Sequence, residues 1–150
     1  MMDTQALIGQ FGDGILDVTE FRGEITITVS PDLLLDVCRF LKNDKSFDCV
    51  VLSDLCGLDR YPEEPRFAVV YNLFSLSHRH RLRLKVLLEG EPPRVASVVS
   101  LWEGADWMER ESFDLYGICF DNHPDLRRIL LPDTFEGHPL RKDFPLEGLS

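Results

Sequence analysis

The sequence lacks the ligand patterns that would hold a metal ion or a redox cofactor. Its cysteines include no Cys-x-x-Cys pair and no histidine partner at zinc-like spacing, and no Gly-x-Gly-x-x-Gly phosphate loop is present. We therefore predict that the chain binds no metal, flavin or iron–sulfur cluster. Cys38 and Cys49 lie among apolar residues and are interpreted as small core side chains of a reduced, cytosolic protein.

Long hydrophobic runs and an excess of basic charge are missing as well. No apolar stretch approaches the roughly 20 residues that span a bilayer, and residues 1–4 lack the basic start of a targeting segment. The net charge of −10 opposes nucleic acid binding, which depends on cationic side chains facing phosphates. We expect one domain, no nucleic acid partner, and membrane contact only through another protein.

The first part of the sequence carries both helix and strand patterns. Residues 30–32 (Ser-Pro-Asp) provide a helix start, with Ser30 as the N-cap, and an apolar stripe at helical spacing follows. This stripe consists of Leu34, Val37, Cys38 and Leu41. The predicted elements are helices over 4–11 and 31–42, a hairpin of strands 15–18 and 24–29 around Arg22-Gly23, and a short strand over 48–52.

Two further strands follow after an expected loop. Residues 54–62 are interpreted as that loop, with Asp54 and Asp59 as turn acids rather than paired catalytic carboxylates. Strands are predicted over 67–74 and 82–88, joined by a turn. In that turn, His78 and His80 are interpreted as solvated and not as metal ligands.

The second of these strands has a charged outer face. Arg81, Arg83 and Lys85 alternate with its apolar residues, so three like charges lie in a row and acidic neighbours are expected opposite them. Further along, Ser97 is predicted to cap a short helix that ends near Trp102. The order of elements does not follow a βαβ repeat, and we predict a two-layer α+β domain with a mixed β-sheet and helices.

A helix over 105–116 mixes charge with large apolar residues. Asp106 and Glu109 suggest a capping box at its start, and Gly117 suits a left-handed cap at its end. Its charge cluster consists of Glu109, Arg110, Glu111 and Asp114. We predict that Arg110 is buried between Asp114 and Glu111 and that the cluster serves structure instead of chemistry. The carboxylates of Glu109, Glu111 and Asp114 are expected to stay ionised beside Arg110.

The segment after this helix shows no sustained helix or strand period from residue 118 onward, and prolines interrupt it. It keeps too many large apolar residues for a solvated tail. We divide the chain into a core domain over 1–120 and an irregular C-terminal docking arm over 121–150. Two basic pairs, Arg127-Arg128 and Arg141-Lys142, are expected to meet acidic groups of a partner.

Three motifs carry a family resemblance: Glu-Arg-Glu-Ser-Phe-Asp-Leu-Tyr-Gly over 109–117, His-Pro-Asp-Leu-Arg-Arg-Ile-Leu over 123–130, and Gly-His-Pro-Leu-Arg-Lys-Asp-Phe-Pro over 137–145. Together they closely resemble the signature of the subunit designated C in proton-pumping NADH:quinone oxidoreductase, respiratory complex I. Upstream segments resemble the family too, although Arg60 interrupts its Asp-Tyr-Pro run. The chain stops soon after the arm, and no fused further domain is expected.

The resemblance implies a non-catalytic subunit of the peripheral hydrophilic arm, on the cytoplasmic side of the inner (plasma) membrane. It implies no catalytic residue and no cofactor in this chain; flavin and iron–sulfur clusters belong to partner subunits, and NADH and quinone are substrates of the complex. The implied partners are the quinone-site subunit, designated D, and the cluster-bearing subunit, designated B. The implied role is to support assembly and the quinone-site module during electron transfer coupled to proton translocation.

Within the arm, the residues expected at the partner interface are His123, Arg127, Arg128, Ile129, Leu130, Arg141, Lys142, Asp143 and Phe144. Two other functions stay open. A membrane-bound hydrogenase or deazaflavin-linked dehydrogenase complex uses a similar subunit, and oxidation of NADH by the purified complex distinguishes it. A stand-alone acid/base enzyme using Glu109, Glu111 and Asp114 would show turnover as an isolated chain.

Overall fold

A five-stranded mixed sheet forms the centre of the molecule in a computed structural model, which describes residues 2–147. The strands lie in the order β1-β2-β5-β4-β3, and neighbours are antiparallel except β2 and β5, which run parallel. The predicted α+β class with a mixed sheet is confirmed. The strands are β1 (Ile15–Phe21), β2 (Glu24–Val29), β3 (Val51–Asp59), β4 (Phe67–Ser75) and β5 (His80–Leu88).

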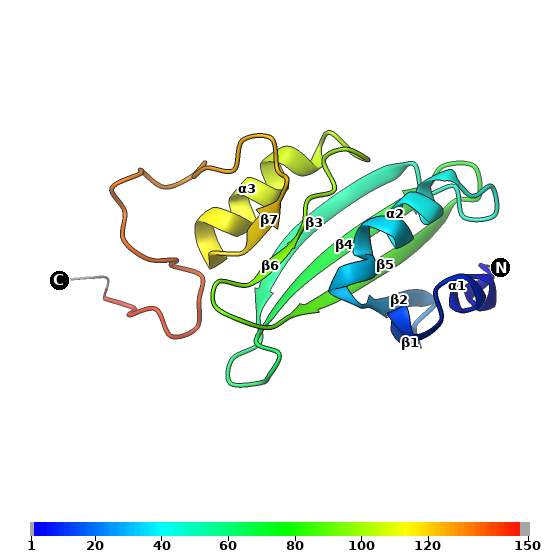
Figure 1. Ribbon diagram of the computed structural model, residues 1–150, viewed down its shortest axis with the longest axis horizontal. Coiled ribbons are helices and arrows are strands. Elements are labelled where there is room, and N and C mark those ends of the chain that lie inside the picture. The colour runs from blue at the N-terminus through cyan, green and yellow to red at the C-terminus, as the bar shows by residue number, and fades with distance from the viewer. Residues whose placement is uncertain (1, 148–150) are drawn as a thin grey trace.

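Helices cover one face of this sheet and make the second layer. In Figure 1, α2 (Leu34–Asn43) lies across the sheet, with α1 (Thr4–Phe11) at the end that carries the N-terminus and α3 (Ala105–Tyr116) at the opposite end. Short 3-10 turns at Gly12–Gly14 and Pro31–Leu33 precede β1 and α2. The helix over 105–116 and the helix over 4–11 are confirmed with the predicted bounds.

The core lies between α2 and the sheet. All members of the predicted stripe are fully buried: Leu34, Val37, Cys38 and Leu41. The even-numbered apolar residues of β5 are buried against them, and so is Cys49, which confirms both cysteines as core side chains. Each element is therefore placed by its apolar period, 3.6 in the helix and two in the strand.

The first hairpin forms where predicted but with a longer first strand. Arg22 and Gly23 both have positive φ, 52° and 79°, which is the backbone of a two-residue hairpin turn. Strand β1 continues to Phe21 because every residue from Asp17 onward finds a partner on β2. The side chains of β1 are almost all exposed. The strand therefore needs no alternation of apolar and polar residues, which is the pattern that predicts strands, and its second half was missed.

The strand expected at 48–52 begins only at Val51, and most of the loop expected at 54–62 is strand. The chain turns at Asp48, whose φ is 46°, and β3 then runs from Val51 to Asp59 along the edge of the sheet. Leu55, Gly57 and Asp59 alternate on its buried side. Pairing with the strongly apolar β4 overrides the local turn signals of this acidic, glycine-containing segment.

Two expectations around α3 are also corrected. The segment after Ser97 forms no helix; β6 (Arg94–Ala96) precedes it, and turns lead to α3. Strand β7 (Cys119–Asp121) pairs in parallel with β6, so regular structure extends past Gly117 and across the expected division at residue 120. Each strand has only three residues, too few for a recognisable period. The division of the chain at residue 120 stays a prediction.

The capping contacts predicted at the starts of α2 and α3 are wrong, although α3 begins where predicted. Ser30 makes no side-chain bond to the helix that it precedes, and Gly104 occupies the start of α3 without a side-chain cap. The expected capping box fails because the Glu109 carboxylate bonds to Ser97 and Val98 instead of its own helix start. Gly117 has φ 76° and ends α3 as predicted.

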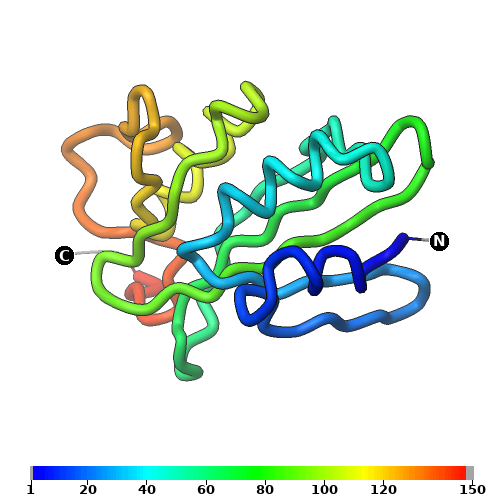
Figure 2. Tube along the Cα trace, turned by 45° about the vertical axis from the view of Figure 1, so that its right-hand side comes forward, coloured from blue at the N-terminus to red at the C-terminus, as the bar shows by residue number. Residues whose placement is uncertain are grey.

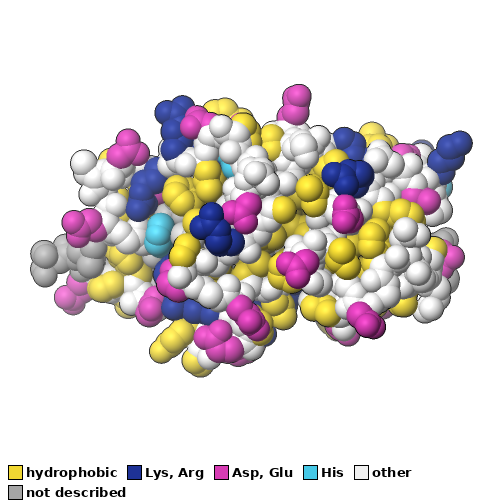
Figure 3. Space-filling model, in the orientation of Figure 1, with side chains coloured by type: hydrophobic (Ala, Val, Ile, Leu, Met, Phe, Trp, Pro, Cys, Tyr) yellow, Lys and Arg dark blue, Asp and Glu magenta, His cyan; other side chains and the backbone are white. Residues whose placement is uncertain are grey.

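The C-terminal segment lies beside α3 and returns to the end of the sheet. Figures 1 and 2 show residues after β7 looping out past α3 and coming back next to the chain that joins β3 to β4. Figure 3 shows side chains of both charge signs interspersed with hydrophobic ones over the face that carries α2. No broad apolar patch dominates this side of the molecule.

Close packing between β3 and α3 depends on a single missing side chain. A Cβ added to Gly57 would lie 2.9 Å from both Ile118 Cδ1 and Tyr116 Cδ2. The Gly57 amide also donates to the Ser112 hydroxyl at 3.0 Å. The edge strand and the helix that supports the C-terminal segment are thus joined where only glycine fits.

We predict that Gly57→Ala destabilises the protein by about 1 to 3 kcal/mol, because the added methyl group must push Tyr116 and Ile118 aside. Gly9→Ala is the matched control: Gly9 lies in α1 with open space around it, so alanine there should stabilise by about 1 kcal/mol. Urea unfolding of the isolated chain measures both. Equal stability of the Gly57→Ala variant and the native chain would contradict the close packing.

Candidate functional site

The C-terminal segment is held by one buried carboxylate of α3. Asp114 Oδ2 accepts hydrogen bonds from the backbone amides of Ile129, Leu130 and Leu131, at 3.2, 2.8 and 2.9 Å. Its Oδ1 accepts a charged bond from Arg128 Nη1 at 2.7 Å. Asp114 is fully buried, and burial alone would raise its pKa, but these donors outweigh it and hold the pKa below the usual range.

Backbone carbonyls at the end of α3 bind the segment further along. His138 Nδ1 lies 2.9 Å from the carbonyl oxygen of Asp114, and Arg141 Nε donates to the carbonyl of Tyr116 at 2.7 Å. Both side chains pass over Gly117, where an added Cβ would lie 2.7 Å from the Arg141 guanidinium. The last turn of the helix, whose carbonyls have no helical partner, therefore becomes an acceptor site for the arm.

A second carboxylate, at the end of β3, fixes the returning end of the arm. Asp59 is buried and accepts from Arg66 Nε and Nη2 at 2.9 and 2.8 Å, and from the Lys142 amide at 2.8 Å. Arg66 also donates to Asp143 at 2.8 Å, so it bridges the core and the arm. The hydrogen bonds from Arg66 hold the pKa of Asp59 far below its usual range. Asp59 Oδ1 also accepts from the Tyr61 amide at 3.0 Å, so Asp59 is the predicted turn acid and an anchor for the arm as well.

Arg110 does not pair with the carboxylates of its own helix, and this prediction is wrong. Its guanidinium donates to the carbonyls of Arg127 and Arg128, at 3.2 and 3.1 Å, and lies over the ring of Trp107. Asp114 is already satisfied by the arm. A helical i,i+4 spacing permits an ion pair, but the arm offers both groups better partners.

Glu109 occupies a different environment from the other charges. It is fully buried and accepts from Ser97 Oγ at 2.6 Å and from the Val98 amide at 2.8 Å. Burial raises its pKa to about 7, these two bonds offset part of the rise, and Asp106 adds to it. Glu109 therefore lies apart from Arg110, and its carboxylate loses its proton less readily than predicted from the sequence.

His123, at the start of the arm, lies beside Asp106 and Glu109 of α3. Its side chain is buried, and its Nδ1 accepts from the Asp125 amide at 2.9 Å. The other nitrogen, Nε2, therefore carries the hydrogen, and it lies 3.0 Å from Asp106 Oδ1 and 4.0 Å from Glu109 Oε2. His123 thus positions the start of the arm against α3.

The four charged residues of α3 consequently do not form one cluster. Glu109 faces residues 97–98, Arg110 and Asp114 face the arm, and Glu111 is exposed. Five surface hollows among residues 2–147 are lined by residues other than Glu109 and Asp114. The contacts of Glu109 and Asp114 with neighbouring segments support structural roles.

The residues expected at a partner interface fall into two groups. His123, Arg128 and Arg141 point toward their own core, and Arg141 also pairs with Glu91 at 3.0 Å. The others keep exposed or half-buried side chains: Arg127, Ile129, Leu130, Lys142, Asp143 and Phe144. The arm is therefore seated on its own domain by one side and presents its other side outward.

Large apolar side chains of the arm and of α3 are exposed, and together we call them the arm surface: Trp107 of α3, and Leu130 and Leu140 of the arm. Trp107 and Leu130 are each 62% exposed and Leu140 is 50% exposed. The backbone of Leu130 is fixed by Asp114, and the amide of Leu140 donates to the Leu115 carbonyl at 3.1 Å. Apolar groups are thus held in solvent by a polar framework beneath them.

Sequence reasoning missed Asp59, Arg66, Ser97 and His138 as parts of this framework. The Gly-His-Pro motif and the acid at the end of the edge strand were visible, but their partners lie far away in the chain. Among residues 2–147, no group of three or more His, Cys, Asp or Glu side chains could hold a metal ion. No helix within the same residues is both long and apolar enough to cross a membrane.

A family model and the relatives that are similar in sequence point to the same protein family. A family model described as respiratory-chain NADH dehydrogenase, 30 Kd subunit, matches residues 27–150. The chain is 48% identical over 143 residues to the NADH-quinone oxidoreductase subunit designated C 2 of Rhizobium meliloti (strain 1021), covering 95% of this chain and 78% of the relative. It is 48% identical to the NADH-quinone oxidoreductase subunit designated C of Geobacter sulfurreducens, covering 93% of this chain and 85% of the relative.

Solved structures show the same fold. A structure described as Nqo5 of the trypsin-resistant fragment (1-134) matches with a TM-score of 0.69 and 30% identity, over 84% of this chain and 100% of that chain. A chain of the membrane-bound sulfane sulfur reductase, an archaeal respiratory membrane complex, matches with a TM-score of 0.74 over 95% of this chain and 86% of that chain. Its identity is 19%, so this second likeness concerns the fold alone.

We predict that Asp114→Ala destabilises the chain by about 3 to 5 kcal/mol, because Arg128 loses its partner and three amides lose their acceptor. Hydrogen exchange should show lost protection at residues 129–131 together with the fall in unfolding free energy. Asp125→Ala is the control: its pair with Arg127 is exposed on both sides and should contribute less than about 1 kcal/mol. Unchanged protection at 129–131 would show that Asp114 does not hold the arm.

A second prediction follows from the raised pKa of Glu109. Between its ordinary value of 4.5 and about 7, the folded chain keeps a proton that the unfolded chain has lost, so stability falls as pH rises through this range. Glu109→Gln resembles the protonated acid and should be more stable than the native chain at a pH of about 8, with the advantage gone at a pH of about 4.

Urea unfolding at several pH values measures the Glu109→Gln effect. Glu111→Gln, an exposed change on the same helix, is the control and should leave the pH profile of the native chain unchanged. If Glu109→Gln and the native chain keep the same difference in stability at every pH, Glu109 does not titrate in this range.

Proposed function

The chain belongs to the respiratory-chain NADH dehydrogenase 30 kDa subunit family, and from this premise we propose that it is the corresponding subunit, designated C, of an NADH:quinone oxidoreductase complex. In this role it supports assembly and the quinone-site module, while electrons pass from NADH to quinone and protons are translocated. The relatives at 48% identity carry the name of that complex, and the match covers most of their length.

One observation carries the docking role: the arm is ordered on its own core while its apolar side chains remain in solvent. Asp114 and Asp59 fix its two ends, and Trp107, Leu130 and Leu140 stay half or more exposed. An interface that is already ordered loses less conformational entropy when a partner binds. We infer that the arm surface is the contact with the quinone-site subunit and the cluster-bearing subunit.

The chain is proposed to contribute no catalytic residue of its own. Glu109 has a pKa suited to proton transfer, but it is enclosed by Ser97, Val98 and His123. We propose that flavin and iron–sulfur clusters lie in partner subunits, and that the chain is peripheral, on the cytoplasmic side of the membrane.

A related membrane-bound complex with another electron donor is the second candidate. The fold likeness to a chain of the archaeal sulfane sulfur reductase shows that such complexes use this architecture. The identity to that chain is 19%, against 48% to the relatives from NADH-quinone oxidoreductase, so the NADH:quinone complex is favoured. Oxidation of NADH by the complex purified with this chain separates the two.

We predict that Leu130→Asp prevents capture of the quinone-site subunit without unfolding the chain, because it puts a charge into the apolar arm surface and leaves the backbone bonds to Asp114 in place. Circular dichroism of the isolated variant checks the fold, and copurification of the complex through a tag on this chain checks assembly. Leu76→Asp is the matched control: Leu76 is also 62% exposed, but it follows the last residue of β4 and lies outside the arm surface. Normal yield of the quinone-site subunit with Leu130→Asp would show that the arm surface is not the contact.

A further inference from the structure

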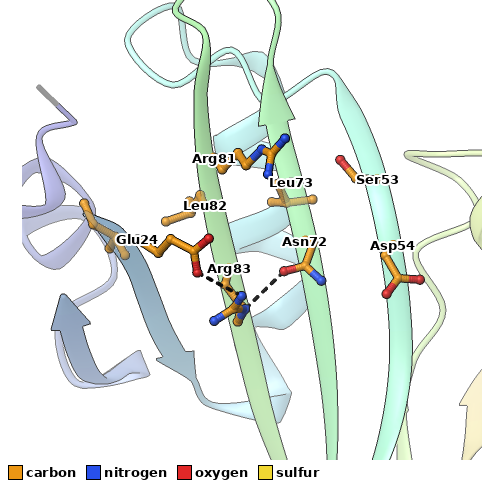
Figure 4. A pocket seen from close by; sticks show the side chains of 9 residues that line it. Glu24, Ser53, Asp54, Asn72, Leu73, Arg81, Leu82 and Arg83 are labelled. Atoms are coloured by element: carbon orange, nitrogen blue, oxygen red, sulfur yellow. Dashed lines mark hydrogen bonds and ion pairs between the residues drawn. The ribbon is translucent and has the colours of Figure 1, made fainter. Parts of the chain in front are cut away.

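Three carboxylates are buried among residues 2–147: Asp59, Glu109 and Asp114. Asp59 and Asp114 each bond to an arginine, at 2.8 and 2.7 Å. The same kind of pair occurs on the open face of the sheet, where Glu24 lies 3.2 Å from Arg83 (Figure 4). Glu109 instead lies near an imidazole, and within the same residues no lysine or arginine comes within 4.0 Å of its carboxylate. Glu109 is therefore the buried acid whose charge no permanent cation compensates.

The neighbouring imidazole, that of His123, is bonded at both of its ring nitrogens. Its Nδ1 accepts from the backbone amide of Asp125 at 2.9 Å, which closes the turn at residues 122–125, the arm root. Its Nε2 donates to the backbone carbonyl of Asp106 at 3.2 Å. A ring that accepts at one nitrogen and donates at the other carries a single hydrogen. A second hydrogen, on Nδ1, would face the hydrogen of the Asp125 amide and break that bond.

Two carboxylate oxygens of α3 flank the same ring nitrogen. Asp106 Oδ1 lies 3.0 Å from His123 Nε2, and Glu109 Oε2 lies 4.0 Å from it. Asp106 Oδ1 is buried and makes no hydrogen bond within the part of the chain that the structure describes. One N–H group thus lies between two acids. When both acids are charged, a single hydrogen has to serve both, and a buried charge without donors is strongly disfavoured.

Ser97 allows Glu109 to hold a proton without a change of partners. Its hydroxyl donates to a charged Glu109 and accepts from a protonated one, across the same 2.6 Å contact. The amide of Val99 donates to the same hydroxyl oxygen at 3.2 Å. The amide of Val98 donates to the other oxygen of the Glu109 carboxylate at 2.8 Å. Residues 97–99 therefore keep their bonds in both states of Glu109, and the change of charge acts on the side of the arm.

The other titratable groups that face Glu109 are a thiol and a phenol, and both stay neutral. Cys38 of α2 and Tyr71 of β4 are fully buried, and burial raises the pKa of each above its ordinary value. The pKa of Glu109 is about 7, raised by burial first and by Asp106 as well. Within the described residues, Asp106 and His123 are therefore the groups that respond when Glu109 gains or loses its proton near neutral pH.

We propose that Glu109 and His123 form a proton-dependent latch, which holds the arm root against α3 while Glu109 is protonated and releases it when Glu109 is charged. With Glu109 neutral, His123 keeps its bonds to Asp106 and Asp125. A charged Glu109 attracts the Nε2 hydrogen away from Asp106, or favours a second hydrogen on Nδ1, and each response breaks one of the two bonds. In the first case the proton of Glu109 passes to solvent, and in the second it passes to His123. The latch is a property of the chain itself, whatever complex the chain joins.

The first test observes both groups in the native full chain and depends on no variant. Carbon-13 NMR of the Glu109 carboxyl and nitrogen-15 NMR of the His123 ring are recorded between a pH of about 5 and about 8.5. We expect the ring signals to change in step with the Glu109 carboxyl, with a midpoint at a pH of about 7. In Glu109→Gln this step should be absent, whereas Glu111→Gln, an exposed change on the same helix, should keep it.

The second test measures opening of the arm root by hydrogen exchange, with rates corrected for the intrinsic effect of pH. We expect protection of the Asp125 amide to fall by about tenfold or more between a pH of about 5 and about 8, because stability linked to a raised pKa is lost as pH rises. In Glu109→Gln the protection should stay constant within about threefold. The Val69 amide, on a strand with neighbours on both sides, is the reference for unfolding of the whole domain and should be at least about tenfold more protected.

Three outcomes would overturn the proposal. Ring signals of His123 that do not follow the Glu109 carboxyl would show that the two groups are not coupled. A step in the ring signals that persists unchanged in Glu109→Gln would show that His123 titrates independently of Glu109. Equal protection of the Asp125 and Val69 amides would show that the arm root opens only when the whole domain unfolds.

Discussion

The path of the C-terminal arm depends on one buried carboxylate meeting three consecutive backbone amides. Irregular chain has no helix or strand partner for its amides, and a buried carboxylate without donors is strongly disfavoured. Asp114 and residues 129–131 satisfy each other, and Arg128 supplies the compensating charge. These bonds hold the irregular segment after Asp121 against α3, although residues 122–147 form no helix or strand.

The same helix shows how the number of donors decides the state of a buried acid. Asp114 receives three amides and a guanidinium, and its pKa is held low in spite of burial. Glu109 receives one hydroxyl and one amide, with no cation on its carboxylate, and burial then raises its pKa to about 7. Both acids join α3 to neighbouring chain. Only the Asp114 contact is built for an ionised carboxylate.

Elements that pack one face against the core could be predicted from the sequence. Contacts between segments far apart in the chain mostly could not. The stripe of α2, the inward residues of β5 and the glycine end of α3 follow from local periods and caps, and all three are confirmed. Strand β3 was mistaken for a loop because its pairing with β4 is not local. Likewise, the i,i+4 spacing of Arg110 and Asp114 predicts that they pair with each other. Both instead bind residues of the arm that lie 14 to 18 positions further along the chain, which local spacing does not reveal.

Because the arm is bound to its own domain, some of its charged side chains are no longer available to a partner subunit. Arg128 and Arg141, expected to meet acidic groups of another subunit, are used on Asp114, Tyr116 and Glu91 of the same chain. What faces outward is mainly Trp107, Leu130 and Leu140, so affinity there rests on apolar area and on the fixed backbone beneath it. The open side of β5 adds no net charge, because Arg81, Arg83 and Lys85 share its hollows with Asp17, Glu24 and Asp54.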